Sequence, residues 1–387
     1  MMQVVDVGFM PLVDAAPLIV AREMGFAARE RLDLRLHRAA NWSMLRDLLD
    51  LGRVDAAHML SPMPVARALG LGGGGGGGGP AVETLMVLSM NGQVVGVSPL
   101  LAQDMQATGL AFGFGDASAT AQALLAARSA GLRIGVPFPF SMHAELLNYW
   151  LGPQVTLTTV PPPDMAAAIG DGEIEAFCVG EPWGSKSVEM GVAQLILPGS
   201  AIWSQAPEKV LAARSGWADD NPGLAGRLMR AVWRAAEWLA QDQNRHLASE
   251  LLGAPDCLSV EPEIIDRALT GRLLTQRRGT TIRSDALLEF HDGAANFPWR
   301  SQAAWIATRM ARRFGLDPTA AAETAQGVWR SDLYRQHLAE IAILPAASSK
   351  VEGACPRPQT VGATRSSLIL ARNRFFDGLV FDPSPEI

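Results

Sequence analysis

Apolar and polar residues alternate along the first part of the chain in two different rhythms. Short aliphatic runs predict strands over 4–9, 32–36, 54–58 and 85–90. Apolar residues at helical spacing predict intervening helices over 15–24, 42–51 and 62–69. Because strands and helices alternate, the pattern predicts an α/β fold with a parallel sheet covered by helices on both faces.

The same rhythm starts again in the middle of the chain. It predicts strands over 132–136, 155–160 and 174–179, and helices over 141–151 and 164–169. An internal echo supports a duplication, since residues 52–57 (G-R-V-D-A-A) align with residues 172–177 (G-E-I-E-A-F), and the same offset pairs Pro62 with Pro182. The sequence therefore predicts two related lobes with a ligand cleft between them.

The chain after about residue 220 has a helical pattern. Helices are expected over 222–242, 262–274, 301–314 and 318–328. The last forty residues are rich in Pro, Ser and Ala, which predicts a loosely packed tail. We therefore predict a discontinuous first lobe, a second lobe in the middle and a hinge with two crossings. The predicted bounds are 1–93 plus 200–340 for the first lobe, 94–199 for the second and 341–387 for the tail.

The amino-acid composition and net charge argue against several classes of function. The net charge of −6 argues against a general nucleic-acid binder, and the three cysteines show no C-x-x-C spacing. No apolar run is long enough for a membrane span, so no membrane association is expected. Only six residues precede the stretch 7–25, which favours a cytoplasmic location. The glycine run 72–79 lacks the Lys and Ser/Thr of a phosphate-binding loop and is expected to be a flexible connection.

Motifs for catalysis are missing from the sequence. There is no G-x-S-x-G, no H-E-x-x-H and no acid pair in a glycosidase context. We therefore assign no catalytic residue, no metal site and no cofactor, and expect a binding protein rather than an enzyme.

Two strand-to-helix junctions in the second half of the α/β region are candidates for ligand binding. Ser141 is a good N-cap, which places His143 in the first helical turn as a donor to a bound anion. The alternative is a surface or interlobe histidine that only hydrogen-bonds. Gly180 follows a buried strand and lets a ligand approach the main chain, with Pro182 opening the next helix. The alternative there is a tight turn with Trp183 packed in the core.

Three further residues complete the candidate set. Trp42 opens a helix, where its indole N–H can point in the plane of a small anion; the alternative is a core tryptophan. Gln93 follows Asn91-Gly92 between two strand-like runs, where a lobe crossover would fall; the alternative is an Asn-Gly hairpin. Lys209, one of three lysines, lies at the start of a strand; the alternative is a solvated side chain.

Several strings together resemble a known family. They are F-M-P-L-V-D-A-A-P-L-I-V-A-R-E-M-G-F, N-W-S-M-L-R-D, H-M-L-S-P-M-P, S-M-H-A-E-L-L-N-Y-W-L and F-C-V-G-E-P-W. The chain resembles, over about residues 3–330, the nitrate-binding proteins of bacterial ABC importers, within the nitrate/sulfonate/bicarbonate substrate-binding family of type II periplasmic-binding-protein fold. The resemblance implies that the anion binds between the lobes through Trp42, Gln93, His143, Gly180 and Lys209.

The chemistry of these residues suits nitrate. Nitrate is planar and singly charged, so it needs coplanar donors and a positive charge rather than a metal or a general base. Bicarbonate would also need an acceptor for its own proton. Related bicarbonate binders use calcium, and no compact calcium loop is present here.

The expected lack of an export signal makes the chain most similar to the cytoplasmic nitrate-sensor branch of that family. That resemblance implies a sensor that holds an ANTAR-type RNA-binding antiterminator and releases it when nitrate or nitrite binds, without touching RNA itself. One alternative is the binding component of a nitrate importer whose signal peptide is missing from this sequence. Another is an enzyme on the same fold, such as a thiamine pyrimidine synthase, whose clustered cysteines are absent.

Overall fold

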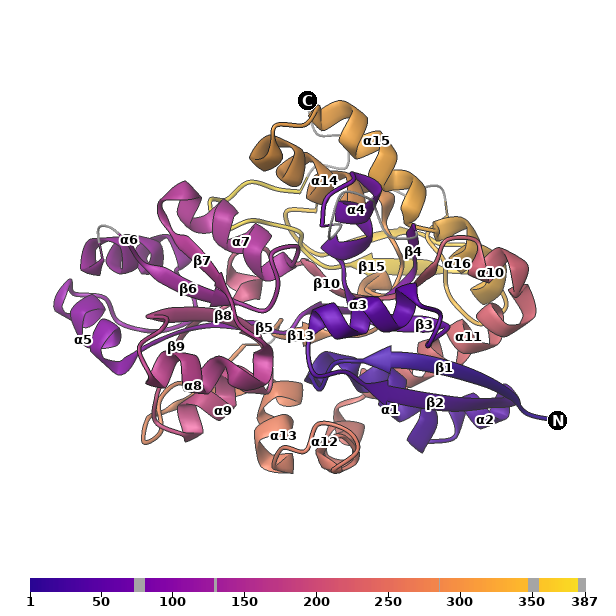
Figure 1. Cartoon of the computed structure of the whole chain (residues 1–387), viewed down its shortest axis with the longest axis horizontal. Coiled ribbons are helices and arrows are strands. Elements are labelled where there is room, and N and C mark those ends of the chain that lie inside the picture. The colour runs from indigo at the N-terminus through magenta and orange to yellow at the C-terminus, as the bar shows by residue number, and fades with distance from the viewer. Residues whose placement is uncertain (73–80, 129–130, 285, 347–354, 382–387) are drawn as a thin grey trace.

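The computed structural model describes residues 1–72, 81–128, 131–284, 286–346 and 355–381, and it places two separate β-sheets side by side (Figure 1). The strand order is β13-β4-β10-β3-β1-β2 in the first sheet and β7-β6-β8-β5-β9 in the second. Helices pack around each sheet, so the molecule has two α/β lobes, as predicted.

The first sheet combines parallel and antiparallel strands. Its strands are β1 (Gln3–Phe9), β2 (Leu32–Arg38), β3 (Ala56–Leu60), β4 (Val82–Asn91), β10 (Pro207–Arg214) and β13 (Leu288–Glu289). β1 pairs in parallel with β2 and β3, whereas β10 runs antiparallel to both β3 and β4.

The second sheet repeats this plan. Its strands are β5 (Gln93–Val97), β6 (Arg133–Val136), β7 (Thr156–Thr159), β8 (Ala176–Gly180) and β9 (Gln194–Pro198). β6 pairs in parallel with β7 and β8, and β5 runs antiparallel to β8 and β9. β3 and β8 therefore occupy equivalent places, which explains the sequence echo that ends in these two strands.

Helices connect and cover the strands. In the first lobe the early helices are η1 (Val13–Ala15), α1 (Ala16–Glu23), α2 (Phe26–Arg29), α3 (Trp42–Asp50) and α4 (Pro62–Ala68). In the second lobe they are α5 (Pro99–Ala107), α6 (Ala117–Ala127), α7 (Met142–Leu151), α8 (Met165–Gly170) and α9 (Trp183–Glu189), with η2 (Gly152–Gln154) and η3 (Pro162–Asp164).

The chain after β10 is mainly helical, as the pattern predicts. The longer helices are α11 (Pro222–Leu239), α12 (Arg245–Gly253), α13 (Pro262–Thr270), α14 (Arg300–Phe314), α15 (Pro318–Val328) and α16 (Ser331–Leu338). Shorter elements are η4 (Gly199–Ala201), α10 (Trp217–Asp220), η5 (Asp242–Asn244), β11 (Arg272–Leu274), β12 (Thr281–Arg283) and η6 (Asp292–Ala294).

The chain crosses from the first sheet to the second at Asn91 and Gly92. β4 and β5 pair with strands of different sheets, so the alternative of an Asn-Gly hairpin is wrong. Asn91 and Gly92 both have positive φ, 57° and 101°, a conformation that asparagine and glycine tolerate better than other residues. The return crossing lies between β9 and β10, so each sheet holds one antiparallel strand that follows the other lobe in sequence.

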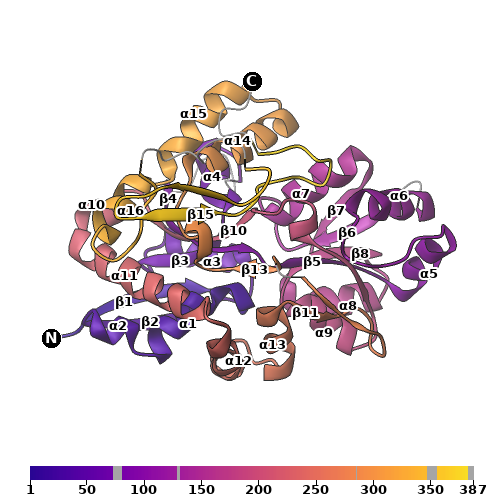
Figure 2. The same cartoon turned by 180° about the vertical axis from the view of Figure 1, so that it is seen from behind.

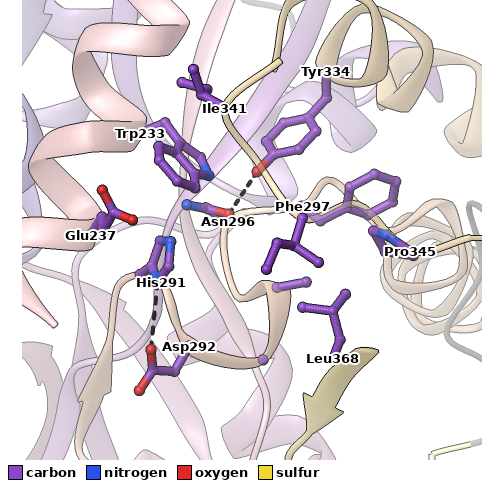
Figure 3. Close-up of a pocket in the computed structure, with 13 residues that line it drawn as sticks. Trp233, Glu237, His291, Asp292, Asn296, Phe297, Tyr334, Ile341, Pro345 and Leu368 are labelled. Carbon is purple, nitrogen blue, oxygen red and sulfur yellow. Dashed lines mark hydrogen bonds and ion pairs between the residues drawn. The ribbon is translucent and has the colours of Figure 1, made fainter. Parts of the chain in front are cut away.

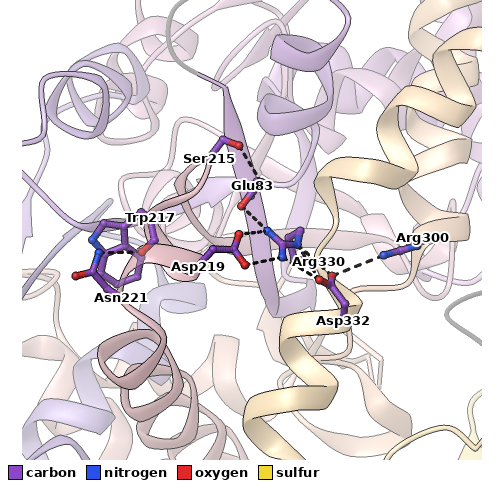
Figure 4. Close-up of polar contacts among 8 residues, drawn as sticks. All are labelled: Glu83, Ser215, Trp217, Asp219, Asn221, Arg300, Arg330 and Asp332. Carbon is purple, nitrogen blue, oxygen red and sulfur yellow. Dashed lines mark hydrogen bonds and ion pairs between the residues drawn. The ribbon is translucent and has the colours of Figure 1, made fainter.

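A network around Arg330 ties the late helices to the first sheet (Figure 4). Its guanidinium lies 3.0 Å from Glu83 of β4, 2.7 Å from Asp219 of α10 and 2.9 Å from Asp332 of α16. One arginine thus bridges carboxylates from three elements far apart in the sequence, and it fixes the C-terminal helices on the first lobe.

The side chains of residues 355–381 are mostly exposed, as expected for a loosely packed tail, but a few buried side chains anchor this segment. This segment forms a hairpin, β14 (Gln359–Gly362) with β15 (Ser367–Leu370), and then runs over the first lobe towards α7 (Figures 1 and 2). Phe375 and Phe381 stack on Trp203 at ring distances of 5.0 and 5.4 Å. The amino-acid composition of the tail did not predict these aromatic contacts, because the aromatic residues are few among Pro, Ser and Ala residues.

Two other features of the chain bear on the sequence predictions. Of the glycine run 72–79 only Gly72 is described, and residues 73–80 lie outside the described part, so the expected flexibility of the run stays a prediction. None of the helices that the structure describes has the length and apolar character needed to cross a bilayer.

Candidate functional site

Two helix N-termini, one from each lobe, present predicted site residues. Trp42 is the first residue of α3, whose N-cap Asn41 accepts a hydrogen bond from the Met44 amide at 2.9 Å. His143 is the second residue of α7, whose N-cap Ser141 accepts a hydrogen bond from the Ala144 amide at 3.1 Å. Capping fixes both helix starts and aims their positive dipole ends at the same region, which favours a bound anion.

Lys209 on β10 is the centre of the cluster. Its ammonium lies 2.7 Å from Oδ2 of Asp14, 2.9 Å from Oε1 of Glu208 and 5.6 Å from the centre of the Trp42 ring. Oε1 of Glu208 also lies 3.1 Å from Nδ1 of His143, in the other lobe. The alternative of a solvated lysine is wrong because Lys209 is completely buried.

Gly180 completes the wall opposite Lys209. A β-carbon added there would lie 3.0 Å from Leu12, 3.6 Å from Oδ2 of Asp14 and 3.9 Å from Nε2 of His143. Only a residue without a side chain leaves that space open for a ligand at the main chain. Gln93 pairs with Gly180 in the second sheet, and its side chain packs against Gly199.

The structure thus joins Trp42, His143, Gly180 and Lys209 in one network and places Gln93 on the strand beside it. Whether these residues bind an anion stays a prediction at this point. Trp42 and His143 are each only 1% exposed, so the alternative of a surface histidine is wrong, whereas an interlobe histidine describes its position correctly.

Sequence reasoning missed three members of the cluster. Asp14 and Glu208 hold Lys209, and Nε2 of His58 lies 3.0 Å from Oδ1 of Asp14. Asp14 and His58 stand inside strings that carried the family resemblance, so the motifs contained a signal that chemistry alone did not identify. Glu208 gave no separate signal because neighbouring residues on a regular strand point to opposite faces.

Several buried donors in this region have no hydrogen-bond partner within the protein. They are Nε1 of Trp42, Nε2 of Gln93 and Nε2 of His143. Leaving a buried donor unsatisfied costs ~1–3 kcal/mol, so these groups require an acceptor from outside the protein. The Trp42 indole beside the Lys209 ammonium, Gln93 on the neighbouring strand and His143 in the tautomer with hydrogen on Nε2 form a suitable arrangement for a small planar oxyanion.

Burial and charge set the protonation states of the cluster. Burial raises the pKa of Glu208 to about 7, against the lowering effect of Lys209. Burial would also raise the pKa of Asp14, but Lys209 and His58 lower it to about 2, so Asp14 is ionised. Burial, reinforced by the charge of Lys209, lowers the pKa of His143 well below its ordinary value, so its imidazole is neutral.

Main-chain and indole contacts hold the two lobes together around the cluster. The Val13 amide donates to the Glu181 carbonyl at 2.8 Å, and the Trp183 indole donates to the Pro11 carbonyl at 2.8 Å. Trp183 is therefore an interlobe contact as well as a packed side chain. With these bonds made, the charged cluster is closed off from solvent.

A separate cavity of about 240 Å³ lies in the first lobe, away from this cluster (Figure 3). Its aromatic wall includes Trp233 and Phe297, and Tyr334 donates to Asn296 at 2.8 Å. Glu237 and Asp292 stand at its exposed side, and neither a lysine nor an arginine lines it. An acidic rim without a cation is unsuited to an anion, so this cavity is not a candidate anion site.

Metal ligation finds no support in the described part of the chain, where no group of three or more His, Cys, Asp or Glu side chains has an arrangement for a metal ion. Cys178 on β8 is completely buried, as expected for a small core residue, and burial raises its pKa well above the ordinary value. Cys178 and Cys257 form no disulfide.

Three buried glutamates give a testable dependence of stability on pH. Burial raises the pKa of Glu145, Glu181 and Glu208 to about 7 in each case, from an unfolded value near 4.5. The folded state therefore binds more protons than the unfolded state between these values, and its stability falls as pH rises through that window. We expect the free energy of unfolding in urea to drop by several kcal/mol, roughly 1–3 per group, from pH 4.5 to 8.

The control for this prediction is Glu145→Gln, which removes one of the three titrations. Its stability should fall less steeply over the same pH range than that of the unchanged protein. A free energy of unfolding that rises or stays level between pH 4.5 and 8 would show that the three glutamates do not have raised pKa values in the folded protein.

Two α/β lobes joined by two crossings, with a buried cluster between them, define a ligand-binding protein of the two-lobed, periplasmic-binding-protein-like class. A family model for the NMT1-like family matches residues 2–253. The chain is 30% identical over 397 residues to the nitrate/nitrite binding protein NrtA of Synechococcus elongatus, covering 98% of this chain and 83% of that protein. The chain belongs to the NMT1-like family.

Two further comparisons extend this result. The chain is 32% identical over 341 residues to the nitrate import ATP-binding protein NrtC of Synechocystis sp., covering 85% of this chain but only 49% of that relative, about half its length. The crystal structure of the periplasmic nitrate-binding protein NrtA from Synechocystis PCC 6803 superposes with a TM-score of 0.82 at 28% identity, covering 99% and 96% of the two chains. The fold is therefore shared over essentially the whole chain.

Proposed function

We propose that the chain is the nitrate- or nitrite-binding component of an ABC-type importer. The observation that carries this proposal is the buried ammonium of Lys209 in one cluster with Trp42 and His143, together with the buried, unpartnered donors of Trp42 and Gln93. The NrtA and NrtC relatives, whose names describe nitrate binding and nitrate import, support the same ligand. Its partners would then be the membrane and ATP-hydrolysing subunits of a transporter.

Titration calorimetry with nitrate, nitrite, hydrogencarbonate and sulfate tests the ligand. We expect nitrate and nitrite to bind and sulfate not to bind. Sulfate carries two negative charges, whereas the cluster has a single ammonium that is already shared by two carboxyl groups. Preferential binding of sulfate would refute the proposed ligand class.

The sensor role predicted from the sequence uses the same anion site but a different partner. No contact in the described residues favours an antiterminator over a transporter, and the relatives with import functions favour the transporter. Release of an antiterminator and a cytoplasmic location therefore stay predictions. A pull-down with and without nitrate distinguishes them: an RNA-binding partner captured only without nitrate would establish the sensor, and reconstituted transport would establish the importer.

A Trp42→Phe change tests the indole donor. Phenylalanine keeps an aromatic ring beside Lys209 but lacks the N–H, so one hydrogen bond to the bound anion is lost. We expect nitrate to bind about tenfold more weakly, which corresponds to ~1.4 kcal/mol. Calorimetry measures the change, with Trp217→Phe on α10 as the matched control that keeps the affinity of the unchanged protein. If Trp42→Phe and Trp217→Phe bind nitrate with equal affinity, the indole of Trp42 is not part of the site.

A further inference from the structure

Two carboxyl groups share one lysine in the candidate anion site. Glu208 is completely buried; its Oε1 contacts Lys209 at 2.9 Å and His143 at 3.1 Å, while its Oε2 has no hydrogen-bond partner. Asp14 approaches the same ammonium from another side, at 2.7 Å, and is bound by His58 at 3.0 Å. A site for an anion thus already holds two groups that can be negative.

The charge of the cluster depends on one proton. With neutral imidazoles at His58 and His143, whose pKa values burial lowers, and with Lys209 charged, the cluster has a net charge of −1 when both carboxyls are ionised. A bound nitrate would make it −2 in a fully buried space, which is strongly unfavourable. A proton on one carboxyl limits the charge of the occupied site to −1.

Glu208 is the carboxyl that can take this proton. Asp14 receives hydrogen bonds or ion-pair contacts at both oxygens, from His58 and Lys209, and these neighbours hold its pKa at about 2. Glu208 has one oxygen free, and burial raises its pKa to about 7. The nearby thiol of Cys178 on β8 stays neutral, because burial and then the charge of Glu208 raise its pKa.

We propose that Glu208 makes anion binding depend on pH, by carrying a proton whenever a monovalent anion is bound. The balance is one proton from solvent and one anion per site: the carboxylate of Glu208 becomes a carboxyl, and no other bond forms or breaks. Nitrate then receives a hydrogen bond from the protonated Glu208.

This inference rests on the proposed function as an anion-binding protein, and it makes a separate measurable claim. If free Glu208 titrates near pH 7, the protonated fraction falls about tenfold from pH 6 to pH 8. The affinity for nitrate should therefore fall about tenfold over that range. At pH 8, binding should take up close to one proton per nitrate.

Calorimetry of the full chain with sodium nitrate at pH 6, 7 and 8 tests the claim, using HEPES and Tris at pH 8 because their ionisation heats differ. Glu208→Gln mimics the protonated side chain, so its nitrate affinity should not vary with pH, should exceed that of the unchanged protein about tenfold at pH 8, and should show no proton uptake. Glu145→Gln is the matched control: Glu145 is buried on α7, pairs with Arg313 at 2.6 Å and also titrates near pH 7, and its loss should leave the pH profile of nitrate binding unchanged.

The outcomes separate the two proposals. Absence of nitrate binding at every pH would refute the proposed ligand. If the unchanged protein binds nitrate independently of pH and of buffer, the proposed proton uptake by Glu208 is refuted, while nitrate binding itself stands. This test needs only the unchanged protein, so it is decisive even if Glu208→Gln does not fold. Proton uptake that persists in a folded Glu208→Gln variant would assign the proton to another group and overturn the role of Glu208.

Discussion

Lys209→Met should weaken nitrate binding at least a hundredfold. Lys209 supplies the one ammonium of the cluster, completely buried between Asp14 and Glu208. Its removal loses a charge-assisted donor to the anion, worth ~1.5–3 kcal/mol, and also loses the positive charge that offsets the two carboxyl groups beside the ligand in a low-dielectric site. Calorimetry with nitrate measures the loss, which at tenfold per ~1.4 kcal/mol reaches or exceeds two orders of magnitude.

Lys186→Met provides the matched control. Lys186 is paired with Glu261 at 2.7 Å but is 29% exposed, so the same substitution removes only a surface ion pair, worth ~0–1 kcal/mol. Its nitrate affinity should equal that of the unchanged protein. Removing one partner of a buried pair also destabilises the fold by ~3–5 kcal/mol, so circular dichroism must first show that Lys209→Met is folded. A folded Lys209→Met variant that binds nitrate within threefold of the unchanged protein would disprove the site.

The sequence predicted the fold well because the signals are local. Strand and helix periods, the N-caps Asn41 and Ser141, and the echo between β3 and β8 each depend on a few neighbouring residues. Trp42, His143 and Gly180 stand at strand-to-helix junctions, where ligand sites of open α/β sheets are expected. Their gathering in the structure follows directly from the two-lobed plan.

The residues that sequence reasoning missed depend on packing between distant segments. Glu208 reaches the same cluster as Lys209 because the pairing of β10 with β4 is irregular at Lys209, so the strict alternation of faces fails there. Asp14 and His58 come together only when η1 and β3 are placed side by side in the folded lobe. No property of the separate segments predicts that two carboxyl groups belong to an anion site.

Local sequence signals did not predict the packing of the C-terminal segment 355–381 either. Because this packing depends on Trp203, we expect a change at Trp203 to have a large effect on stability. Trp203 is completely buried, stacks on Phe375 and Phe381, and donates from its indole to Asn373 at 2.6 Å. Tyr149 of α7 contacts Phe375 at a ring distance of 5.0 Å and donates to Asp377 at 2.8 Å. The segment therefore binds the first lobe through Trp203 and the second lobe through Tyr149.

Trp203→Ala should lower the free energy of unfolding by ~3–5 kcal/mol, because it removes a fully buried indole and leaves a cavity. Urea denaturation measures this loss, and Trp238→Ala on α11, where the side chain is only partly buried, is the control with a smaller loss. Limited proteolysis adds a second readout: cleavage within residues 355–381 should be faster in Trp203→Ala, since the stacking that holds this segment is gone. Unchanged cleavage together with a loss below ~1 kcal/mol would show that the segment is held by other contacts, and that the aromatic stack is not what joins it to the two lobes.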